Sequence, residues 1–527
     1  MKYNITENDK ALLLQNCMNY KYKIVVKDND NRIIDVLNNA EINSYSIDGE
    51  NLERRTFSLS VNNLHDIQKY IQTCLLYNFV LYIGVKSLRT DEYIWYECGT
   101  FVSLDINTLY DATTNRAETA FADWFARLGG TRNGQIGGSP TITIPNKDAD
   151  GNLVTVKDAL INFLKSEGIL KFIVEDIGEF YGIPANNPSG YEAYRTENPK
   201  WNKLPYDLEF NIGNTDGDVI KKFVDLYPNT QAYFDVYNHF CVGPIPSCTH
   251  NPVDLDNAFL QKILVSENSE NVTYDISAIR NVTEVYGKIL KIDRFSESCT
   301  TSENTYTITL DKYEAYLGYQ YIAFTPDTAN IENMQIQINS LPALPIYKEY
   351  TEISVEKETL KAGKVYVIRI FQNDEGSFAA YFLGEYQPHA VCVLTEDEND
   401  EHYTKSYFQE KYNCSNIILR VEKDSPFSVQ KLGEILETKS GEDFDSIISD
   451  SIAIDNAVYY NRKSSSLNDT VSITTKLIPW LDVMCKVEYK KAQDNQVLQY
   501  LIKNITHNIS GGTSTITMNR LYPLYYN

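Results

Sequence analysis

Residues 21–36 read KYKIVVKDNDNRIIDV and carry the clearest structural signal in the chain. Two short runs rich in β-branched residues, Lys21–Val26 and Arg32–Val36, flank the polar stretch Lys27–Asn31. Such runs, separated by a few turn-forming residues, are typical of a β-hairpin. The sequence therefore predicts that the fold begins with a pair of antiparallel strands.

Beyond this hairpin, the first hundred residues continue in short segments of strand character. One helix is expected at 64–76, where apolar residues recur at helical spacing. A small β-barrel or sandwich with one helix would close such a unit. The further strands are expected at 42–47, 55–61, 79–83 and 93–102.

A second region, 113–205, has a different composition and includes Gly- and Pro-rich connections. A helix is predicted from 117 to 128, because Ala117, Phe121 and Leu128 fall on one helical face and Gly129-Gly130 follows as a stop. A second helix is predicted at 156–167. Further along, a helix is expected at 218–226 and a hairpin at 231–242.

The remainder of the chain is again mostly of strand character. Residues 305–390 form a compact run of predicted strands separated by turn residues, which indicates an inserted β-module. Helical stretches are expected at 429–436 and 444–450. The chain closes with strands at 485–489, 497–507 and 513–520, the last two joined by a Gly511-Gly512 turn.

The predicted fold class is α+β, mainly β, and multidomain, because 527 residues exceed the ~250–300 that one hydrophobic core usually serves. Two β-domains, each interrupted by an insertion, are expected. The predicted boundaries are 1–112 for the first β-domain, 113–205 for a small α+β insertion, 206–270 for the return segment of the first domain, 271–297 for the start of the second β-domain, 298–432 for an inserted β-sandwich-like module, and 433–527 for the C-terminal part of the second domain.

Charge and cysteine content narrow the classes of function. The formal net charge of −23 argues against sequence-specific nucleic-acid binding, which needs a basic surface, but suits a wall past which DNA slides without sticking. The nine cysteines are widely spaced and imply thiols in a reducing compartment. With no apolar stretch of about 18 residues and no signal peptide in MKYNITENDK, we expect a soluble protein made in a cytoplasm.

The sequence contains no motif of a known catalytic or nucleotide-binding site, so no catalytic residues, no cofactor and no enzymatic activity are predicted. One metal candidate is His239, Cys241, Cys248 and His250, which a hairpin through 243–247 would bring together as a tetrahedral zinc site. The alternative is that these are ordinary strand residues. The spacing does not follow the usual CxxC pattern and a chain of this size needs no metal to fold, so the second interpretation is favoured and no metal is predicted.

Several short motifs resemble those of tail hub proteins from phages and prophages of Gram-positive bacteria. Within the inserted module, Tyr316–Tyr321, Leu341–Ile346 and Leu360–Gly363 resemble a small β-module of tail and fibre proteins. The hub motifs are Arg54–Leu59, Thr114–Arg116, Asp123-Trp124, Gly134-Gln135, Ile144-Pro145, Leu204–Phe210, Asp225–Pro228, Tyr233–Asp235, Ile478–Leu481, Asn508–Thr517 and Arg520–Tyr525.

This resemblance implies a homotrimer in which each chain carries two tube-like β-domains, so that three subunits match the six-fold tail tube. The implied partners are the tail tube protein, distal tail or baseplate proteins and a central spike or tip protein. DNA would pass through the ring without specific binding, and this chain would not insert into a membrane. The implied location is the tail tip or baseplate of the virion.

Two alternatives stay open at this point. The first is a receptor- or glycan-binding tail protein whose 305–390 module contacts the host surface, with Tyr313, Tyr316, Tyr319 and Tyr321 stacking on sugars. The second is a tail-associated cell-wall hydrolase. Core packing explains the tyrosines as well, and the sequence shows no peptidase or lysozyme domain at its C-terminal end.

Overall fold

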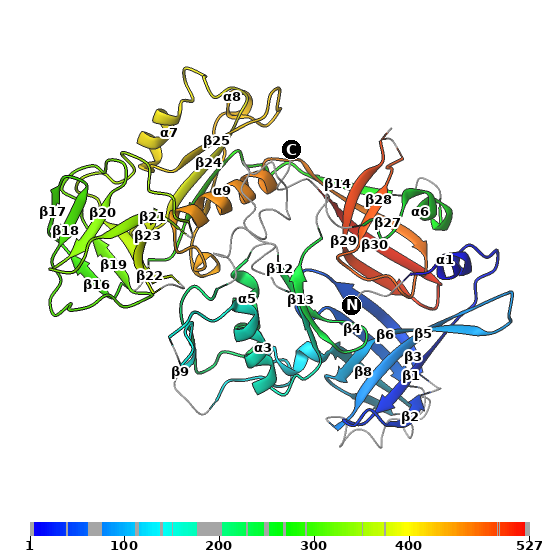
Figure 1. Ribbon diagram of the computed structural model, residues 1–527. Helices are drawn as coiled ribbons and strands as arrows, with labels where there is room; N and C mark the ends of the chain where they lie inside the picture. Colours follow the sequence, from blue (N-terminus) through cyan, green and yellow to red (C-terminus); the bar gives the residue numbers. More distant parts are fainter. Residues whose placement is uncertain are drawn as a thin grey trace.

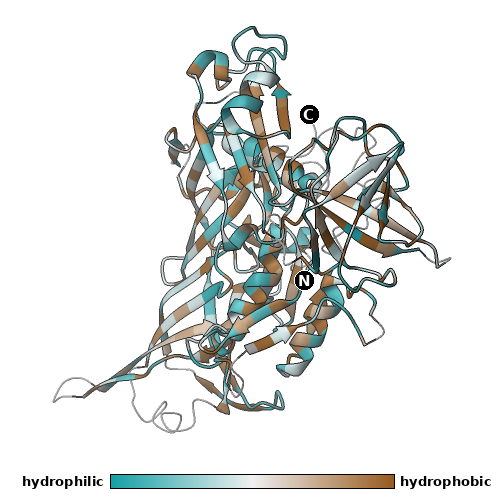
Figure 2. Cartoon of the chain, turned by 90° about the vertical axis from the view of Figure 1, so that its left-hand side faces the viewer, coloured by the Kyte–Doolittle hydropathy of each residue, from teal (hydrophilic) through white to brown (hydrophobic). Residues whose placement is uncertain are grey.

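The computed structural model confirms the prediction of a mainly β chain, with 42% strand and 16% helix. Several sheets and a few helices make up an elongated assembly of units (Figure 1). Polar and apolar residues alternate along many of the strands (Figure 2). The structure describes residues 5–37, 40–61, 76–110, 115–137, 141–149, 151–175, 203–227, 230–246, 252–266, 270–289, 292–349, 351–373, 376–492, 494 and 496–521.

The largest sheet has thirteen strands and draws on both ends of the chain. Its strands follow the order β14-β27-β30-β29-β3-β4-β8-β6-β5-β1-β2, with β28 beside β29 and β7 beside β8. Helices α1 (Glu7–Leu13) and α6 (Asn257–Ile263) pack against this core. The strands are β1 Tyr20–Lys27, β2 Ile33–Leu37, β3 Ala40–Asp48, β4 Arg55–Val61, β5 Asn78–Lys86, β6 Tyr93–Ser103, β7 Asn107–Tyr110, β8 Asn115–Asp123, β14 Glu270–Asp275, β27 Asn468–Lys476, β28 Lys486–Tyr489, β29 Leu498–Asn508 and β30 Thr513–Arg520.

The predicted opening hairpin is confirmed by β1 and β2, which pair antiparallel with Val25 opposite Val36. A second antiparallel pairing, between β3 and β29, joins the N-terminal and C-terminal strands into one sheet. We call this pairing the seam; it places Ile47 opposite Ile505 and Tyr45 opposite His507. The two groups of strands therefore share one hydrophobic core. The predicted division into two β-domains stays a prediction.

A small α+β region lies between the main sheet and the rest of the molecule (Figure 1). Its helices α3 and α5 confirm the predictions at 156–167 and 218–226, and each begins at a threonine whose hydroxyl caps the first turn. The β12–β13 pair confirms the hairpin predicted at 231–242. The elements are η2 Trp124–Arg127, β9 Thr141–Ile144, α3 Val156–Ser166, β10 Phe172–Val174, β11 Leu208–Asn211, α5 Asp216–Asp225, β12 Thr230–Phe234 and β13 Phe240–Pro244.

An eight-stranded sheet with its own hydrophobic core occupies 294–385 and includes most of the module predicted at 305–390. That this segment is an insertion stays a prediction, and we keep the name inserted module for it. A four-stranded sheet, β25-β24-β15-β26, lies next to it and is covered by α9 (Figure 1). The remaining elements are β15 Val282–Tyr286, β16 Arg294–Ser296, β17 Cys299–Ser302, β18 Thr305–Ile308, β19 Tyr321–Phe324, β20 Gln335–Ile338, β21 Leu344–Lys348, β22 Tyr366–Gln372, β23 Phe378–Glu385, β24 His389–Thr395, α7 Lys405–Tyr412, β25 Ile417–Val421, α8 Val429–Leu432, β26 Leu436–Lys439, η5 Glu442–Phe444 and α9 Asp450–Ser464.

The helix predicted from 117 to 128 is wrong. Residues 115–123 form β8, which pairs with β4 on one side and β6 on the other. Ala117, Thr119 and Phe121 are buried, while the residues between them are half-buried, so the true period is two. Because this segment pairs with a strand on each side, it forms a strand even though its alanines favour a helix.

Two further predictions differ in outcome. The helix predicted at 64–76 falls almost entirely outside the described residues. The C-terminal hairpin is confirmed, but its connection is longer than a two-residue turn, because strand pairing ends at Asn508 and Thr513. The four residues 509–512 form the loop, and Gly512 has a φ of 63°, a left-handed conformation that favours glycine.

Candidate functional site

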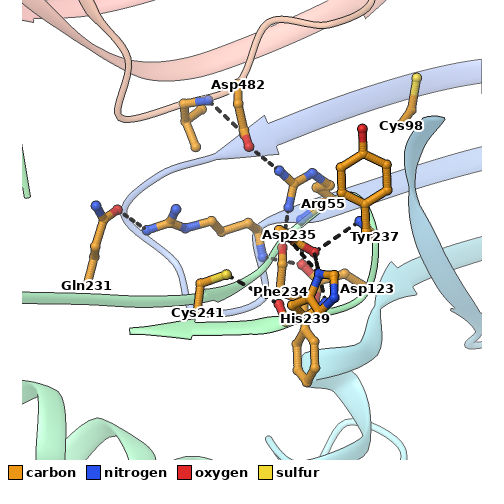
Figure 3. Close-up of polar contacts among 12 residues, drawn as sticks. Arg55, Cys98, Asp123, Gln231, Phe234, Asp235, Tyr237, His239, Cys241 and Asp482 are labelled. Atoms are coloured by element: carbon orange, nitrogen blue, oxygen red, sulfur yellow. Dashed lines mark hydrogen bonds and ion pairs between the residues drawn. The ribbon is translucent and has the colours of Figure 1, made fainter. Parts of the chain in front are cut away.

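Motifs that lie far apart in the sequence meet at one place in the fold (Figure 3). Arg54 and Arg55 lead into β4, Asp123 ends β8, Phe234 ends β12, and Asp482 lies in the loop before β28. Hydrogen bonds and an ion pair connect these residues. We call this group the arginine junction; it links the main sheet, the α+β region and the C-terminal segment.

Asp123 holds the start of β4 in place. One of its carboxylate oxygens, Oδ2, accepts the backbone N–H groups of Arg54 and Arg55 at 2.9 and 3.0 Å. The other, Oδ1, accepts the N–H of Phe125 at 3.0 Å and so caps the short η2 helix. One buried carboxylate thereby satisfies three backbone donors that would otherwise lack partners.

The Arg55 side chain is 1% exposed and joins two other segments. One guanidinium nitrogen donates to the backbone carbonyl of Phe234, and the other forms an ion pair with Asp482. The Tyr45 ring, from β3, lies in the same buried region. A planar guanidinium with donors on two sides suits this task better than a lysine ammonium would.

Arg54 extends the junction toward the β12–β13 hairpin. Its guanidinium donates to Gln231 Oε1 at 3.0 Å and lies 4.1 Å from the centre of the Tyr233 ring. The residue is 3% exposed. The contacts of Arg54 and Arg55 therefore hold the hairpin to the main sheet from two directions.

Burial and pairing act differently on the two arginines. Burial lowers the pKa of Arg54. Burial alone would also lower the pKa of Arg55, but the neighbouring groups, Asp482 first among them, together outweigh burial and hold that pKa above its usual value. Burial raises the pKa of Asp123, against the opposing effect of the N–H groups of Arg55, Phe125 and Arg54. The Arg55 guanidinium therefore stays charged at neutral pH.

A histidine and a cysteine lie beside the junction but are not arranged as a nucleophile and its base. The His239 ring contacts the buried Asp235 carboxylate at 3.1 Å through Nδ1. The Cys241 thiol donates to the backbone carbonyl of His239, not to its ring. Burial raises the pKa of Cys241, which is the opposite of what a nucleophilic cysteine requires.

The predicted zinc candidate is only partly described. His239 and Cys241 lie at the start of β13, whereas Cys248 and His250 fall outside the described residues. Within the part of the chain that is described, no group of three or more His, Cys, Asp or Glu residues is placed to hold a metal ion. The expectation that these four residues bind no metal therefore stays a prediction.

The tyrosines proposed for glycan stacking can be assessed in part. Tyr313 and Tyr316 are 6% and 9% exposed and belong to the core of the inserted module. Their hydroxyls donate to Gln320 Oε1 and to the Pro342 carbonyl, each at 2.7 Å. Tyr313 and Tyr316 therefore pack in the core, and their ring faces are not accessible for stacking on a sugar.

The sequence resemblance already contained most of the arginine junction. Arg54 and Arg55, Asp123, and Phe234 all belong to motifs quoted for it, but nothing in the sequence placed these motifs together. Asp482 was missed, although it directly follows the Ile478–Leu481 motif. The available signal was the pair of adjacent arginines at a strand start in a strongly acidic chain, since buried cations need anionic partners.

Comparison with known sequences gives one match. Residues 424–525 match the family described as a domain of unknown function, DUF5048. This match covers about a fifth of the chain and includes α9 and the last four strands of the main sheet. The search of curated proteins found no match. Among the described residues, none of the helices is long and apolar enough to span a membrane.

Comparison with solved structures gives tail proteins. The tail protein from Neisseria meningitidis MC58 has a TM-score of 0.43 at 6% identity, covering 96% of this chain and 99% of that one. The prophage MuSo2 43 kDa tail protein from Shewanella oneidensis gives 0.40 at 10%, covering 95% and 99%. The prophage tail protein gp18 from Listeria monocytogenes EGD-e gives 0.41 at 11%, covering 94% of each chain. These values are too low to argue function or domain arrangement from the likeness.

Proposed function

We propose that this chain is a structural hub subunit of a bacteriophage tail or of a phage-derived particle. In this role three copies form a ring that joins the six-fold tail tube to the baseplate or tail tip and lines the DNA channel. The ring contacts the tail tube protein, distal tail or baseplate proteins and a central spike or tip protein in the virion. Its work is mechanical and involves no catalysis.

The observation that carries the proposal is the pair of open edges of the main sheet. Within the described residues, the strand path ends at β2 on one side and at β14 on the other. Ile33 and Ile34 on β2 are 65% and 49% exposed, and Tyr274 and Ile276 at β14 are 48% and 73% exposed. Monomeric proteins usually protect sheet edges with charges, prolines or bulges. The exposed apolar side chains on β2 and at the end of β14 are suited to burial against a neighbouring subunit.

The two edges are different surfaces of the same chain. A contact between the β2 edge of one copy and the β14 edge of the next is therefore a head-to-tail interface, which closes into a ring when the rotation between copies fits. Such a ring leaves neither edge open. The net charge of −23 further suits a channel wall that repels DNA instead of trapping it.

The arginine junction supports the same role. A subunit that transmits force between rings needs its segments to move as one body, and the junction ties three of them together through buried contacts. Arg54, Arg55, Asp123 and Phe234 of the junction belong to the motifs through which the sequence resembles tail hub proteins. The restriction to phages of Gram-positive hosts stays part of the proposal.

The test is the mass of the purified protein in solution, measured by light scattering after size-exclusion chromatography. We expect three times the mass of one chain. Ile34→Lys and Ile276→Lys place a charge at each edge and should shift the protein to monomers. The control is Ile353→Lys, at a residue of the inserted module that is 61% exposed, which should leave the trimer intact.

A wild-type protein that stays monomeric at high concentration, and also in the presence of tail tube protein, would overturn the hub assignment. A trimer that survives both edge substitutions would show that the interface lies elsewhere and would remove the argument from the sheet edges.

A further inference from the structure

A lysine and an aspartate are buried against each other among the C-terminal strands of the main sheet. Asp469 is the second residue of β27, and Lys491 follows β28, in the orange and red part of Figure 1. Lys491 Nζ lies 2.9 Å from Asp469 Oδ2, and their side chains are 10% and 2% exposed. This pair contributes nothing to the arginine junction.

Neighbouring side chains hold the pair in a fixed orientation. The Tyr500 hydroxyl donates to the same oxygen, Asp469 Oδ2, at 2.9 Å. The Tyr274 hydroxyl lies 3.2 Å from Lys491 Nζ, and the centre of its ring lies 5.2 Å from that nitrogen. Glu270 on β14 accepts the backbone N–H of Ala492 at 2.9 Å, which anchors the segment next to Lys491.

The second carboxylate oxygen is the unusual feature of this site. Asp469 Oδ1 is buried and has no hydrogen-bond partner among the described residues. For an ionised carboxylate, a buried oxygen without a donor is costly, since it has lost its water and gained nothing in exchange. A neutral amide carbonyl in the same place would carry less charge and a smaller cost.

The amine must lose a proton before it can react. Burial alone would lower the pKa of Lys491, but the contacts with Asp469 and Tyr274 together outweigh burial and raise that pKa. The proton that must leave already lies along the 2.9 Å Nζ–Oδ2 contact. Its transfer converts two buried charges into a neutral amine and a neutral carboxylic acid, which burial favours.

We propose that Lys491 and Asp469 condense to form an intramolecular amide cross-link. The Nζ lone pair attacks Cγ of the protonated Asp469 carboxyl, so that a C–N bond forms. The Cγ–Oδ2 bond of Asp469 then breaks. The departing Oδ2 hydroxyl takes up one proton from the amine and leaves as water, and the Tyr500 hydroxyl is placed to relay that proton. One water is lost in total, and no oxidant, reductant or further reactant is consumed.

The cross-link would tie the beginning of β27 to the segment that follows β28. Between these strands, the sheet order β27-β30-β29 with β28 beside β29 is held by non-covalent contacts: backbone pairing, side-chain hydrogen bonds and a shared apolar core. A covalent bond across this set would stop the strands from separating under load or in denaturant. The inference does not depend on the proposed hub function.

The test is the intact mass of the full chain by mass spectrometry under reducing conditions. We expect the wild-type mass to be lower than the sequence mass by one water. Asp469→Asn should still condense but release ammonia, so its mass should fall by one ammonia below its own sequence mass. Lys491→Arg keeps the positive charge and the ion pair but should show the full sequence mass.

Digestion of the wild-type protein must also release a branched peptide that contains both Lys491 and Asp469. A wild-type protein at its full sequence mass would overturn the proposal. So would a mass lower by one water without a branched peptide, because a succinimide at an aspartate gives the same loss without a cross-link. Circular dichroism of the Lys491→Arg protein shows whether this variant is folded. If it is not, the loss of ammonia from Asp469→Asn still tests the cross-link independently.

Discussion

The arginine junction and the start of α9 both hold large units together with buried charges, but they do so in different ways. At the junction, the Arg55 guanidinium faces the Asp482 carboxylate. At the start of α9, the buried Asp450 carboxylate accepts the backbone N–H groups of Glu385 and His389 at 3.2 and 3.4 Å. The inserted module and the four-stranded sheet are thereby attached to α9.

The consequence of this difference appears in the pKa values. At Arg55 the neighbouring groups, with the Asp482 carboxylate first among them, together outweigh burial and keep the guanidinium charged. Burial outweighs the hydrogen bonds at Asp450 and raises its pKa to about 7. A cation compensates a buried carboxylate far better than backbone dipoles do. The Arg55 guanidinium is therefore expected to stay charged near neutral pH, and the α9 contact to be sensitive to pH.

The largest expected effect comes from breaking the ion pair. Arg55→Met leaves the Asp482 carboxylate and the Phe234 carbonyl without their partner and should lower the free energy of unfolding by about 3–5 kcal/mol. Urea denaturation followed by circular dichroism measures this loss. Arg32→Met is the control, because the Arg32 side chain is 75% exposed and its loss should change little. A loss below about 1 kcal/mol for Arg55→Met would contradict the structural role given to the junction.

The next effect comes from steric pressure at the α9 contact. Gly384 has a φ of 115°, and a Cβ atom added there would lie 2.2 Å from Asp450 Cγ. Gly384→Ala should therefore cost roughly 2–4 kcal/mol, measured by the same denaturation. The double variant Gly384→Ala/Asp450→Gly removes all three close contacts, with Asp450 Cγ, Oδ2 and Cβ, and should recover part of that loss. No recovery would show that backbone strain at 384, and not contact with Asp450, explains the cost.

The smallest effect in the wild-type protein is its net pH dependence, because two buried groups act in opposite directions. The folded protein holds the Asp450 proton up to about pH 7, whereas the ordinary pKa of an aspartate is 3.8, so this stability is lost as the pH rises from about 4 to 7. Burial lowers the pKa of His507, at the seam, from 6.5 to about 4. That stability is lost as the pH falls from about 6.5 toward 4.

Single substitutions should separate these two dependences of stability on pH, which we call the Asp450 slope and the His507 slope. Asp450→Asn leaves the His507 effect, so the variant should lose stability on acidification from pH 7 to 4.5. His507→Gln leaves the Asp450 effect and should gain stability over the same range. Since one pKa unit corresponds to about 1.4 kcal/mol, each slope should reach at least about 1 kcal/mol. Thermal melts at a series of pH values measure both, and slopes of the same sign in the two variants would contradict this account.

The mainly β fold class and many individual elements could be predicted from the sequence. The hairpin at 21–36 and the helices at 156–167 and 218–226 are confirmed because strand alternation, helical spacing and capping residues act over a few neighbouring positions. Residues 117–128 show where such local signals fail. Apolar residues there fit a helical face, but the segment lies between two strands, and pairing decided its conformation.

The sequence by itself determined which short segments form strands and helices, because those preferences depend on the residues themselves and their immediate neighbours. It also contained the residues of the arginine junction without any indication that they meet. Only the tertiary structure decided that β3 pairs with β29, about 460 residues further along the chain, and that Arg55 lies against Asp482. Such contacts follow from the burial of shared apolar surface and the pairing of buried charges, which depend on the whole fold and leave no local pattern to read.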